Sequence, residues 1–319
     1  MVMADKVLVL ANSCISTMVY TYPVPEAHIQ IDSNFSANLT VGCMGPGKAF
    51  NLKKLGFDTF LHTVLGSDQP GRRIMEKLDY EGIRLIYDID PAGTNTHVNI
   101  MTVDGRRSSV NIITPTLSPE IDLSRLEPII AESDYIALNV NNYCRHVIPM
   151  IKKYHRNIWC DLGDFEVGNP YFDDFAEAAT HITMSGIYIN DQEAVLEQFM
   201  KKGKTLVVIT NGAEGSVAVT DSGEHITTPA IKDYQLVDSN GAGDSFFSGL
   251  LYGYSKGFPI RKSLEIATII AGLTVSSIEL FNRDLCEDLV SAEYERVYFH
   301  GGTSNKVNAA YARQAHDAD

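Results

Sequence analysis

The stretch Asp238-Ser239-Asn240-Gly241-Ala242-Gly243-Asp244 decides how the rest of the chain is interpreted. The apolar pair Leu236-Val237 before it is typical of a strand end, and apolar residues follow it at helical spacing: Phe246, Phe247, Leu250, Leu251 and Tyr254. The sequence therefore predicts a sharp turn from a strand into a helix, made through glycines that let another molecule approach the backbone. At such a helix start the N–H groups of Gly241, Ala242 and Gly243 point outward and form a binding site for an anion.

Asp244 follows directly on these donors, which is unusual at a site that only binds phosphate. A carboxylate there repels a bound anion, so we infer a chemical role, such as taking the proton from a hydroxyl group. An anion site beside a general base is what phosphoryl transfer to an alcohol requires. The alternative is that Asp244 is an acidic residue of the first helical turn, favoured there by the helix dipole and without chemical function.

The composition is that of an acidic globular protein with one large α/β domain. Of its 319 residues, 45% are hydrophobic and 21% are charged, and the net charge is −14 at pH 7. That charge, without any basic run, argues against nucleic acid as a partner. We also expect no membrane association, because no apolar run approaches membrane-spanning length. The start of the chain shows no signal-peptide pattern, and the five scattered cysteines are typical of reduced thiols in the cytoplasm: Cys14, Cys43, Cys144, Cys160 and Cys286.

Alternating strand and helix patterns predict an α/β fold with a mostly parallel central sheet flanked by helices on both faces. The expected strands include Lys6–Ala11, Thr59–Leu65, Ile83–Ile89, Tyr135–Asn139, Ile158–Asp161, Ile182–Met184, Leu206–Thr210 and Ser216–Thr220. Two segments interrupt the alternation: an extended stretch over residues 18–41 and a β-hairpin over residues 95–113, with its turn at Asp104-Gly105. We expect them to meet in one small β lid on a domain of residues 1–300, followed by a poorly ordered tail at 301–319.

Four loops follow extended segments and are expected on one edge of the central sheet: Gly42–Gly47, Asn190–Glu193, Thr210–Gly215 and Asp238–Asp244. Ligands of open α/β sheets bind outside the carboxyl ends of the strands. We therefore expect these loops to line the binding site.

Four ordered motifs within residues 6–280 resemble those of ribokinase-like (PfkB-type) carbohydrate kinases. Gly42-x-x-Gly45-x-x-x-Ala49, ending in Leu55-Gly56, is similar to the family's first signature, and Gly66-x-Asp68-x-x-Gly71 with Gly82 is similar to the segment after it. Asn190-x-x-Glu193 resembles the magnesium-and-phosphate motif, and Asp238–Asp244 resembles the second signature, with serine where threonine is usual. The resemblance implies a kinase that uses ATP and Mg²⁺ to phosphorylate a small sugar or sugar-like substrate.

The resemblance also implies roles for the matched positions. Asp244 would be the catalytic base, and the amides of Gly241, Ala242 and Gly243 would stabilise the transferred phosphoryl group. The nucleotide and its metal ion would be bound by Asn190, Glu193, Thr210, Gly212, Gly215 and Asp238, with Asn190 and Glu193 holding Mg²⁺ through water. For Asn190 and Glu193 the alternative is a capping box without function, and for Thr210 and Gly212 it is a plain junction between strand and turn.

The acceptor half of the pattern departs from the family. Cys14-Ile15-Ser16 stands where relatives commonly have Asn-x-Asp, and Ser16 only partly replaces an aspartate that accepts hydrogen bonds from two hydroxyls. In the first signature Cys43 replaces a hinge glycine, Met44 a polar residue, and Gly47 an asparagine that contacts substrate. The candidate substrate-binding residues are Ser16, Gly42, Gly45, Gly47, Asn99 and Asn139, with Asn12 and Asn141 as further candidates. For each serine or asparagine the alternative is a local hydrogen bond at a turn or strand end.

Three functions are open at this point. The first is a kinase of a sugar or sugar acid, the second is a nucleoside kinase of the same fold, and the third is a nucleotide-binding regulatory protein with weak or no catalysis. Asp244 argues against the third, because an unused carboxylate beside a phosphate site would only weaken binding. The segment after Ser276 shows no clear match to the family's monovalent-cation loop, so a need for such an ion is left open. In many relatives the lid also pairs subunits, and we expect a homodimer joined through it.

Overall fold

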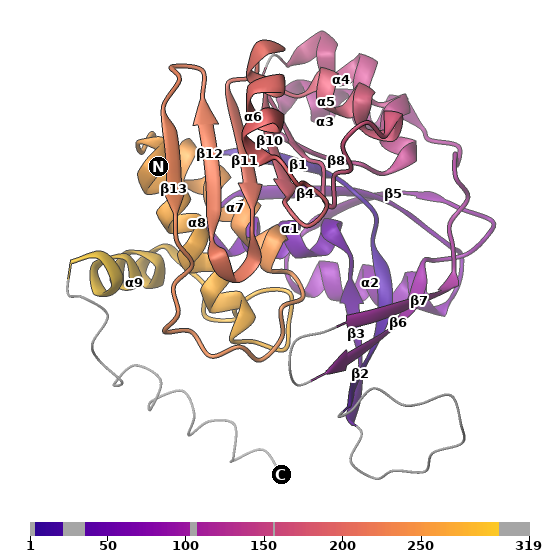
Figure 1. Ribbon diagram of the computed structural model, residues 1–319. Coiled ribbons are helices and arrows are strands. Elements are labelled where there is room, and N and C mark those ends of the chain that lie inside the picture. The colour runs from indigo at the N-terminus through magenta and orange to yellow at the C-terminus, as the bar shows by residue number, and fades with distance from the viewer. Residues whose placement is uncertain (1–3, 22–35, 103–106, 156, 300–319) are drawn as a thin grey trace.

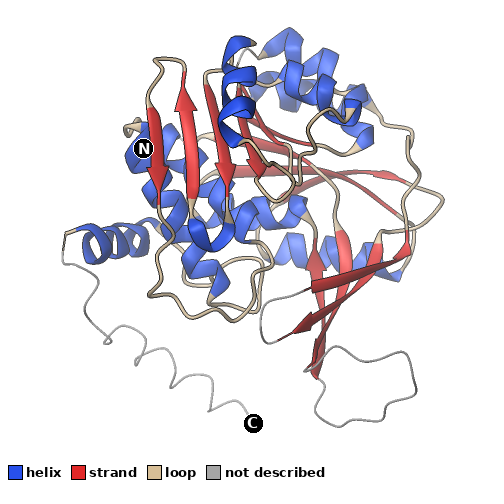
Figure 2. Cartoon of the chain, in the orientation of Figure 1, coloured by secondary structure: helices blue, strands red, loops and turns tan. Residues whose placement is uncertain are grey.

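A central sheet, helices on both of its faces and a second, smaller sheet make up the computed structural model, which describes residues 4–21, 36–102, 107–155 and 157–299 (Figures 1 and 2). The predicted hairpin turn at Asp104-Gly105, the middle of the first lid segment and the tail at 301–319 lie outside these residues. Among the residues that the structure describes, none of the helices is both long and apolar enough to cross a lipid bilayer.

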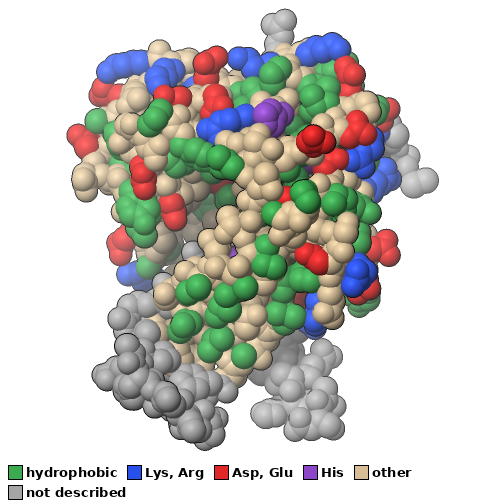
Figure 3. Space-filling model, turned by 90° about the vertical axis from the view of Figure 1, so that its right-hand side faces the viewer, with side chains coloured by type: hydrophobic (Ala, Val, Ile, Leu, Met, Phe, Trp, Pro, Cys, Tyr) green, Lys and Arg blue, Asp and Glu red, His purple; other side chains and the backbone are tan. Residues whose placement is uncertain are grey.

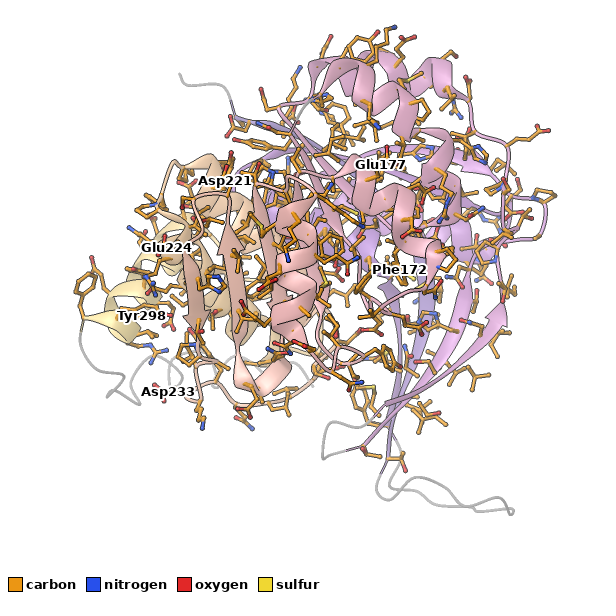
Figure 4. All side chains as sticks on the ribbon, turned by 45° about the horizontal axis from the view of Figure 1, so that its top comes forward. Phe172, Glu177, Asp221, Glu224, Asp233 and Tyr298 are labelled. Carbon is orange, nitrogen blue, oxygen red and sulfur yellow. The ribbon has the colours of Figure 1, made fainter. Side chains whose placement is uncertain are left out.

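The central sheet has the strand order β13-β12-β11-β10-β9-β8-β1-β4-β5. Its strands are β1 (Lys6–Leu10), β4 (Asp58–Leu65), β5 (Arg84–Ile89), β8 (Tyr135–Asn139), β9 (Ile158–Asp161), β10 (His181–Ser185), β11 (Leu206–Thr210), β12 (Ser216–Thr220) and β13 (His225–Thr228). Neighbouring strands from β5 to β11 are parallel, whereas β12 and β13 form an antiparallel hairpin at one edge. The turn of this hairpin, with Asp221 and Glu224, lies away from the small sheet (Figure 4).

Two hydrophobic cores, one on each face of the central sheet, hold the helices. In β1, Val7 and Val9 pack into one core while Leu8 and Leu10 pack into the other, as the alternation of side chains in a strand requires. The first core is covered by α1 (Met44–Lys54), α2 (Gln69–Tyr80), α7 (Ala242–Ser255), α8 (Ile260–Val275) and α9 (Glu287–Tyr298). The second is covered by α3 (Leu123–Glu132), α4 (Ile148–Tyr154), α5 (Asp173–Ala178) and α6 (Gln192–Lys201), which cluster together in Figure 1. Short 3₁₀ turns are η1 (Asn142–His146), η2 (Pro170–Phe172) and η3 (Gly212–Glu214).

The small sheet joins the two segments that interrupt the strand–helix alternation, as the sequence predicts. Its order is β3-β2-β6-β7, from β2 (Cys14–Thr21), β3 (Ser36–Gly42), β6 (Thr96–Thr102) and β7 (Arg107–Ile113). The parallel pairing of β2 with β6 connects the segments and sets Ser16 beside His97 and Met18 beside Asn99. In Figure 2 this sheet projects from one end of the molecule, apart from the central sheet.

Two local predictions are wrong. Leu236-Val237 does not end a strand: Val237 is 44% exposed and lies in a loop, where its N–H donates to the Val275 carbonyl at 2.7 Å. Asn190 does not cap a helix either, because α6 begins after Asp191, whose carboxylate accepts from the Ala194 N–H at 3.0 Å. The capping-box alternative for Asn190 and Glu193 is therefore excluded.

Candidate active site

A cavity of about 540 Å³ lies between the carboxyl ends of the central strands and the small sheet. Its wall includes Asn12, Asn141, Asp161, Ser185 and Thr210, which end β1, β8, β9, β10 and β11 or follow them within two residues. The cavity brings together eight of the residues predicted from the sequence: Asn12, Ser16, Asn99, Asn141, Thr210, Gly241, Gly243 and Asp244. It occupies the edge at which ligands of α/β sheets bind.

The N-terminus of α7 faces this cavity through Gly241 and Gly243. Gly241 has a φ of 82°, and a Cβ on it would lie 3.0 Å from the backbone of Leu280, so both conformation and space require glycine there. The Ala242 N–H donates to the Ser239 carbonyl at 3.3 Å and does not point outward as predicted. The N–H groups of Gly243 and Asp244 belong to the first helical turn, which has no intrahelical acceptors for them. These two amides are therefore available as donors to a ligand at the start of α7.

Asp244 is held by a fully buried lysine that the sequence analysis did not single out. Lys48 Nζ on α1 lies 2.5 Å from Asp244 Oδ1 and 2.8 Å from Asp161 Oδ2. The Lys48 side chain has no exposed surface, whereas the carboxylates of Asp161 and Asp244 are 13% and 12% exposed at the cavity. The three side chains form one ion cluster, with the cation inside the protein and both anions at the wall.

The protonation of this cluster follows from burial and charge. Burial raises the pKa of the Asp244 carboxyl to about 6, Lys48 opposes the rise, and the charge of Asp161 adds to it. Burial lowers the pKa of Lys48, but Asp161 and Asp244 outweigh that effect and raise the pKa above its ordinary value. Lys48 therefore stays charged, and Asp244 is ionised at neutral pH while keeping a higher proton affinity than an exposed aspartate.

Gly47 explains how Asp244 reaches Lys48. A Cβ at residue 47 would lie 2.4 Å from Asp244 Oδ2 and 2.9 Å from its Cγ. An asparagine at this position would push Asp244 away from α1. Gly47 does not line the cavity with a side chain; it makes room for the Asp244 carboxylate.

Asp238 is buried and bonded to protein groups. Its Oδ1 accepts from the Asn240 N–H at 2.8 Å, and its Oδ2 accepts from the Tyr20 hydroxyl of the small sheet at 2.8 Å. Burial, helped by the Asp238 charge, raises the pKa of Tyr20 well above its usual value, so the phenol stays a donor. Asp238 thus fixes the loop before α7 and ties that loop to β2.

The other predicted nucleotide and metal residues lie apart from the lining of this cavity. Asn190 and Glu193 are exposed, and Glu193 Oε1 lies 3.7 Å from His225 Nδ1. Gly212 and Gly215 form the turn after β11 with φ values of 54° and 97°. Of the six residues predicted to bind the nucleotide and its metal ion, Thr210 is the one that lines the cavity.

One wall of the cavity, the predicted acceptor side, is formed by a face of the small sheet. Ser16, His97 and Asn111 lie in one row across β2, β6 and β7, and Asn99 and Ser109 lie in the next. Ser16 Oγ and His97 Nε2 are 2.7 Å apart, and Asn99 Oδ1 accepts from Ser109 Oγ at 2.6 Å. This wall is polar but carries no carboxylate among its described residues.

The remaining predicted substrate residues do not line the cavity: Gly42 packs against the small-sheet wall, whereas Gly45 and Asn139 pack against the end of β1. A Cβ on Gly42 would lie 2.4 Å from Ser16 Oγ, and one on Gly45 would lie 2.7 Å from the Asn12 carbonyl. Asn139 is fully buried and donates to the Leu10 carbonyl at 3.2 Å. Of the further candidates, Asn12 and Asn141 line the cavity, and Asn141 Oδ1 accepts from the Asn12 N–H.

Three residues of the site were not predicted from the sequence, although two of them, Lys48 and Asp161, stand in patterns that could have identified them. Lys48 precedes Leu52 and Leu55 by four and seven positions, so helical periodicity puts its side chain on the buried stripe, where a charge requires a carboxylate partner. Asp161 ends a buried parallel strand at the edge where ligands bind. His97 gave no such signal, because only the pairing of β2 with β6 sets it beside Ser16.

Comparison with known proteins gives consistent matches over most of the chain. A model of the pfkB family carbohydrate kinases matches residues 16–149 and 175–282. The acarbose 7(IV)-phosphotransferase of Actinoplanes sp. (strain SE50/110) is 28% identical over 274 residues, covering 82% of this chain and 89% of that protein.

Solved structures match the fold as a whole. The microbiome-derived acarbose kinase Mak1 superposes with a TM-score of 0.82 at 23% identity, covering 92% of this chain and 100% of that one. Ribokinase of Arabidopsis thaliana, complexed with ribose and ATP, superposes with a TM-score of 0.76 at 20% identity, covering 92% and 99%. The ribokinase-like fold predicted from the sequence is confirmed.

Proposed function

Because the chain belongs to the pfkB family of carbohydrate kinases, we propose that it transfers the terminal phosphoryl group of ATP to a hydroxyl of a neutral, polyhydroxylated carbohydrate. The observation that carries the proposal is the position of Asp244, at the cavity wall and beside the N-terminus of α7. This arrangement combines a base for the acceptor hydroxyl with amide donors for the phosphoryl group.

Asp244 is the general base in this proposal. Lys48 occupies Oδ1, so Oδ2 takes the proton of the acceptor hydroxyl. The acceptor oxygen then forms its bond to the terminal phosphorus, and the bond to the leaving oxygen of ADP breaks. The amides of Gly243 and Asp244 stabilise negative charge on the transferred group, and the dipole of α7 adds to their effect.

The residues at the start of α7 fit the phosphates of ATP. Apart from its chain neighbours and the backbone of α7, no described atom lies within 4 Å of the place that a Cβ on Gly243 would occupy, so a phosphate oxygen can approach the backbone there. Asn190 and Glu193 are exposed oxygen-bearing side chains, which suits an ion that keeps part of its water shell. When bound, Mg²⁺ would neutralise phosphate charge, and Asn190 and Glu193 would orient its water ligands.

The chemistry of the cavity favours a neutral carbohydrate as the acceptor. Among the lining residues that the structure describes there is no lysine or arginine to bind the carboxylate of a sugar acid, and three carboxylates, Asp161, Asp164 and Asp244, would repel it. The described lining of the small sheet has no Phe, Tyr or Trp on which a nucleobase could stack. The wall instead offers amides, which donate to and accept from hydroxyls: Asn12, Asn95, Asn99, Asn111 and Asn141.

A panel of acceptors tests this proposal. With ATP and Mg²⁺ we expect ribose and fructose to be poor substrates, because Ser16 pairs with His97 where a charged aspartate is usual. A lost hydrogen bond to a charged group costs roughly 1.5–3 kcal/mol, so two lost bonds lower kcat/KM by orders of magnitude. The panel adds acarbose, on which the Actinoplanes relative acts, a keto-deoxy sugar acid and several nucleosides. A nucleoside or sugar acid turned over faster than every neutral carbohydrate would contradict the proposed acceptor class.

Glu193→Gln is expected to raise the Mg²⁺ concentration for half-maximal activity several-fold, with little change in the KM of the acceptor. The reason is that an amide is a weaker partner than a carboxylate for the water ligands of Mg²⁺. Steady-state rates over a range of Mg²⁺ concentrations measure this effect. Glu197→Gln is the matched control, because Glu197 is also exposed and lies one turn further along α6. An unchanged Mg²⁺ dependence together with a lower melting temperature would mean that Glu193 serves only its contact with His225.

The outer face of the small sheet supports a homodimer. Leu39, Thr17, Val98 and Val110 lie in one row across its four strands, on the face opposite the cavity. Leu39, Val110 and Ile112 are 43%, 51% and 60% exposed, and Figure 3 shows hydrophobic side chains gathered in the lower half of the molecule, where this sheet lies. An apolar sheet face with open edges is suited to cover by a second copy of the chain.

The double change Val110→Asp with Ile112→Asp is expected to turn a wild-type dimer into a monomer. Two buried charges without partners would oppose association at this face. Sedimentation at micromolar concentrations measures the result, with Leu117→Asp as the control, because Leu117 is 74% exposed and lies outside the small sheet. A monomeric wild-type protein would refute the proposed interface.

A further inference from the structure

Three metal-binding side chains from distant parts of the chain meet at the acceptor side of the cavity. Cys14 begins β2, Cys43 precedes α1, and His97 lies on β6. One ligand atom of each, Sγ, Sγ and a ring nitrogen, lies within 4.8 Å of the other two. Cys14 Sγ and His97 Nε2 are 3.7 Å apart. Cys43 and His97 line the cavity, and Cys14 is fully buried behind them.

These separations are close to those of a tetrahedral zinc site. With Zn–S bonds of about 2.3 Å and Zn–N bonds of about 2.0–2.1 Å, ligand atoms lie about 3.4–3.8 Å from one another. Small rotations of the side chains are therefore enough to bring all three onto one ion. Thiolate and imidazole are ligands that select zinc over magnesium, so this site would not compete for the ion that accompanies ATP.

The backbone at Cys43 is an independent observation. Cys43 has a φ of 73°, which makes it the one non-glycine residue with positive φ among the described parts of the chain. Glycine adopts this conformation without strain, whereas a residue with a Cβ does not. The strain is accompanied by a thiol directed at Cys14 and His97, which a glycine could not supply.

The surroundings of the cluster also suit a metal ion. Asn95 Nδ2 donates to Cys43 Sγ at 3.7 Å, a contact that stabilises a thiolate and orients it. Ser16 Oγ lies 2.7 Å from His97 Nε2 and 3.4 Å from Cys14 Sγ, on the side that faces the cavity. Three protein ligands leave a fourth position open, as in zinc sites that act on a bound water or substrate rather than on folding alone.

We propose that Cys14, Cys43 and His97 bind one zinc-class divalent cation at the acceptor wall, with the fourth position beside Ser16. Binding releases the thiol protons of both cysteines and uses the unprotonated nitrogen of His97. With two thiolates and a neutral imidazole the site would carry no net charge, so the ion would offer the acceptor an open coordination position rather than a charge, where the sequence lacks the usual aspartate. The proposal does not rest on the kinase activity and is tested without it.

Titration of the reduced, metal-free protein with Co²⁺ under anaerobic conditions tests the site. We expect one equivalent to bind with visible bands of tetrahedral Co²⁺ and an ultraviolet band of cobalt–thiolate charge transfer, and Zn²⁺ to abolish both. Cys43→Gly and His97→Gln should each weaken binding at least about 100-fold. Cys286→Ser, which changes an exposed cysteine outside the cluster, should leave binding unchanged.

Cys43→Gly also separates metal binding from folding, because glycine relieves the backbone strain at this position. The melting temperature of the Cys43→Gly variant should therefore match or exceed that of the wild type. Octahedral Co²⁺ spectra without the thiolate band, or undiminished binding in Cys43→Gly, would overturn the proposal. The reduced protein could instead bind no Co²⁺, lose two thiols on oxidation and regain them with a reductant. That result would contradict the metal site and indicate a Cys14–Cys43 disulfide in its place.

Discussion

Asp244→Asn is expected to lower kcat by on the order of 10²-fold or more, while the affinity for ATP should stay the same or rise slightly. The amide has the shape of the carboxylate and leaves the backbone of α7 in place, but it cannot take the proton of the acceptor. It also removes a negative charge beside the phosphate site, which favours the nucleotide. Steady-state kinetics with the preferred acceptor measures the first effect, and calorimetric titration with ATP measures the second.

The ATP titration is also the control for folding, because binding requires an intact start of α7. A variant that binds ATP and turns over near the wild-type rate would refute Asp244 as the base. A variant that binds no ATP would instead indicate that the Lys48 cluster has collapsed. Its melting temperature then distinguishes a folding defect from a catalytic one.

Lys48→Met is expected to impair both stability and the pH dependence of catalysis. The change leaves Asp161 and Asp244 close together without the cation between them. Removing one partner of a buried ion pair costs roughly 3–5 kcal/mol of unfolding free energy. The variant should be most stable in acid, because an aspartate with a pKa above its unfolded value loses stability as pH rises through that pKa.

The pH profile of kcat/KM follows from the same cluster. The base must be ionised, so wild-type activity falls as pH drops through the Asp244 pKa of about 6. Without Lys48 the pKa rises further, and the acid limb should move up by at least about one pH unit. Lys54→Met, on the same helix but bonded to the Arg283 carbonyl, should leave the limb in place. Adding Asp161→Asn to Lys48→Met should restore part of the lost stability. A folded Lys48→Met protein whose acid limb of kcat/KM lies at the wild-type pH would contradict the role of Lys48.

The fold could be predicted because its signals are local. Runs such as Leu206–Thr210 and the glycines that end helices mark each strand and helix without reference to the rest of the chain. The error at Leu236-Val237 has a physical cause, since two apolar residues give the same pattern in a strand as in an exposed loop, here one that is hydrogen-bonded through the Val237 N–H to the end of α8. Helix α3 escaped notice because it is short and contains Pro128, although Leu126 and Ile130 bury one face of it.

The site could be predicted only in part, because its key contacts join residues that are distant in sequence. The Asp238–Asp244 loop contains both the candidate base and the candidate amide donors, so it could be identified from the sequence alone. Lys48 lies 196 positions from Asp244, and no local pattern connects them. Gly47 was interpreted as a lost substrate contact, whereas the structure shows that its missing side chain admits Asp244. Residue type predicted the reaction, and tertiary packing determined which neighbours control it.

The hydrogen bond from Tyr20 to Asp238 couples the position of the small sheet to that of the loop before α7. If the small sheet swings outward, it removes a partner from a carboxylate that is only 4% exposed and loosens the loop that shapes the phosphate site. Without an acceptor, the open enzyme would then bind ATP at a poorly ordered loop. With the acceptor bound and the small sheet closed, the loop would be ordered around the phosphates. Coupling of this kind would limit hydrolysis of ATP in the absence of an acceptor, because ATP would be poised for reaction only when the acceptor has already replaced water.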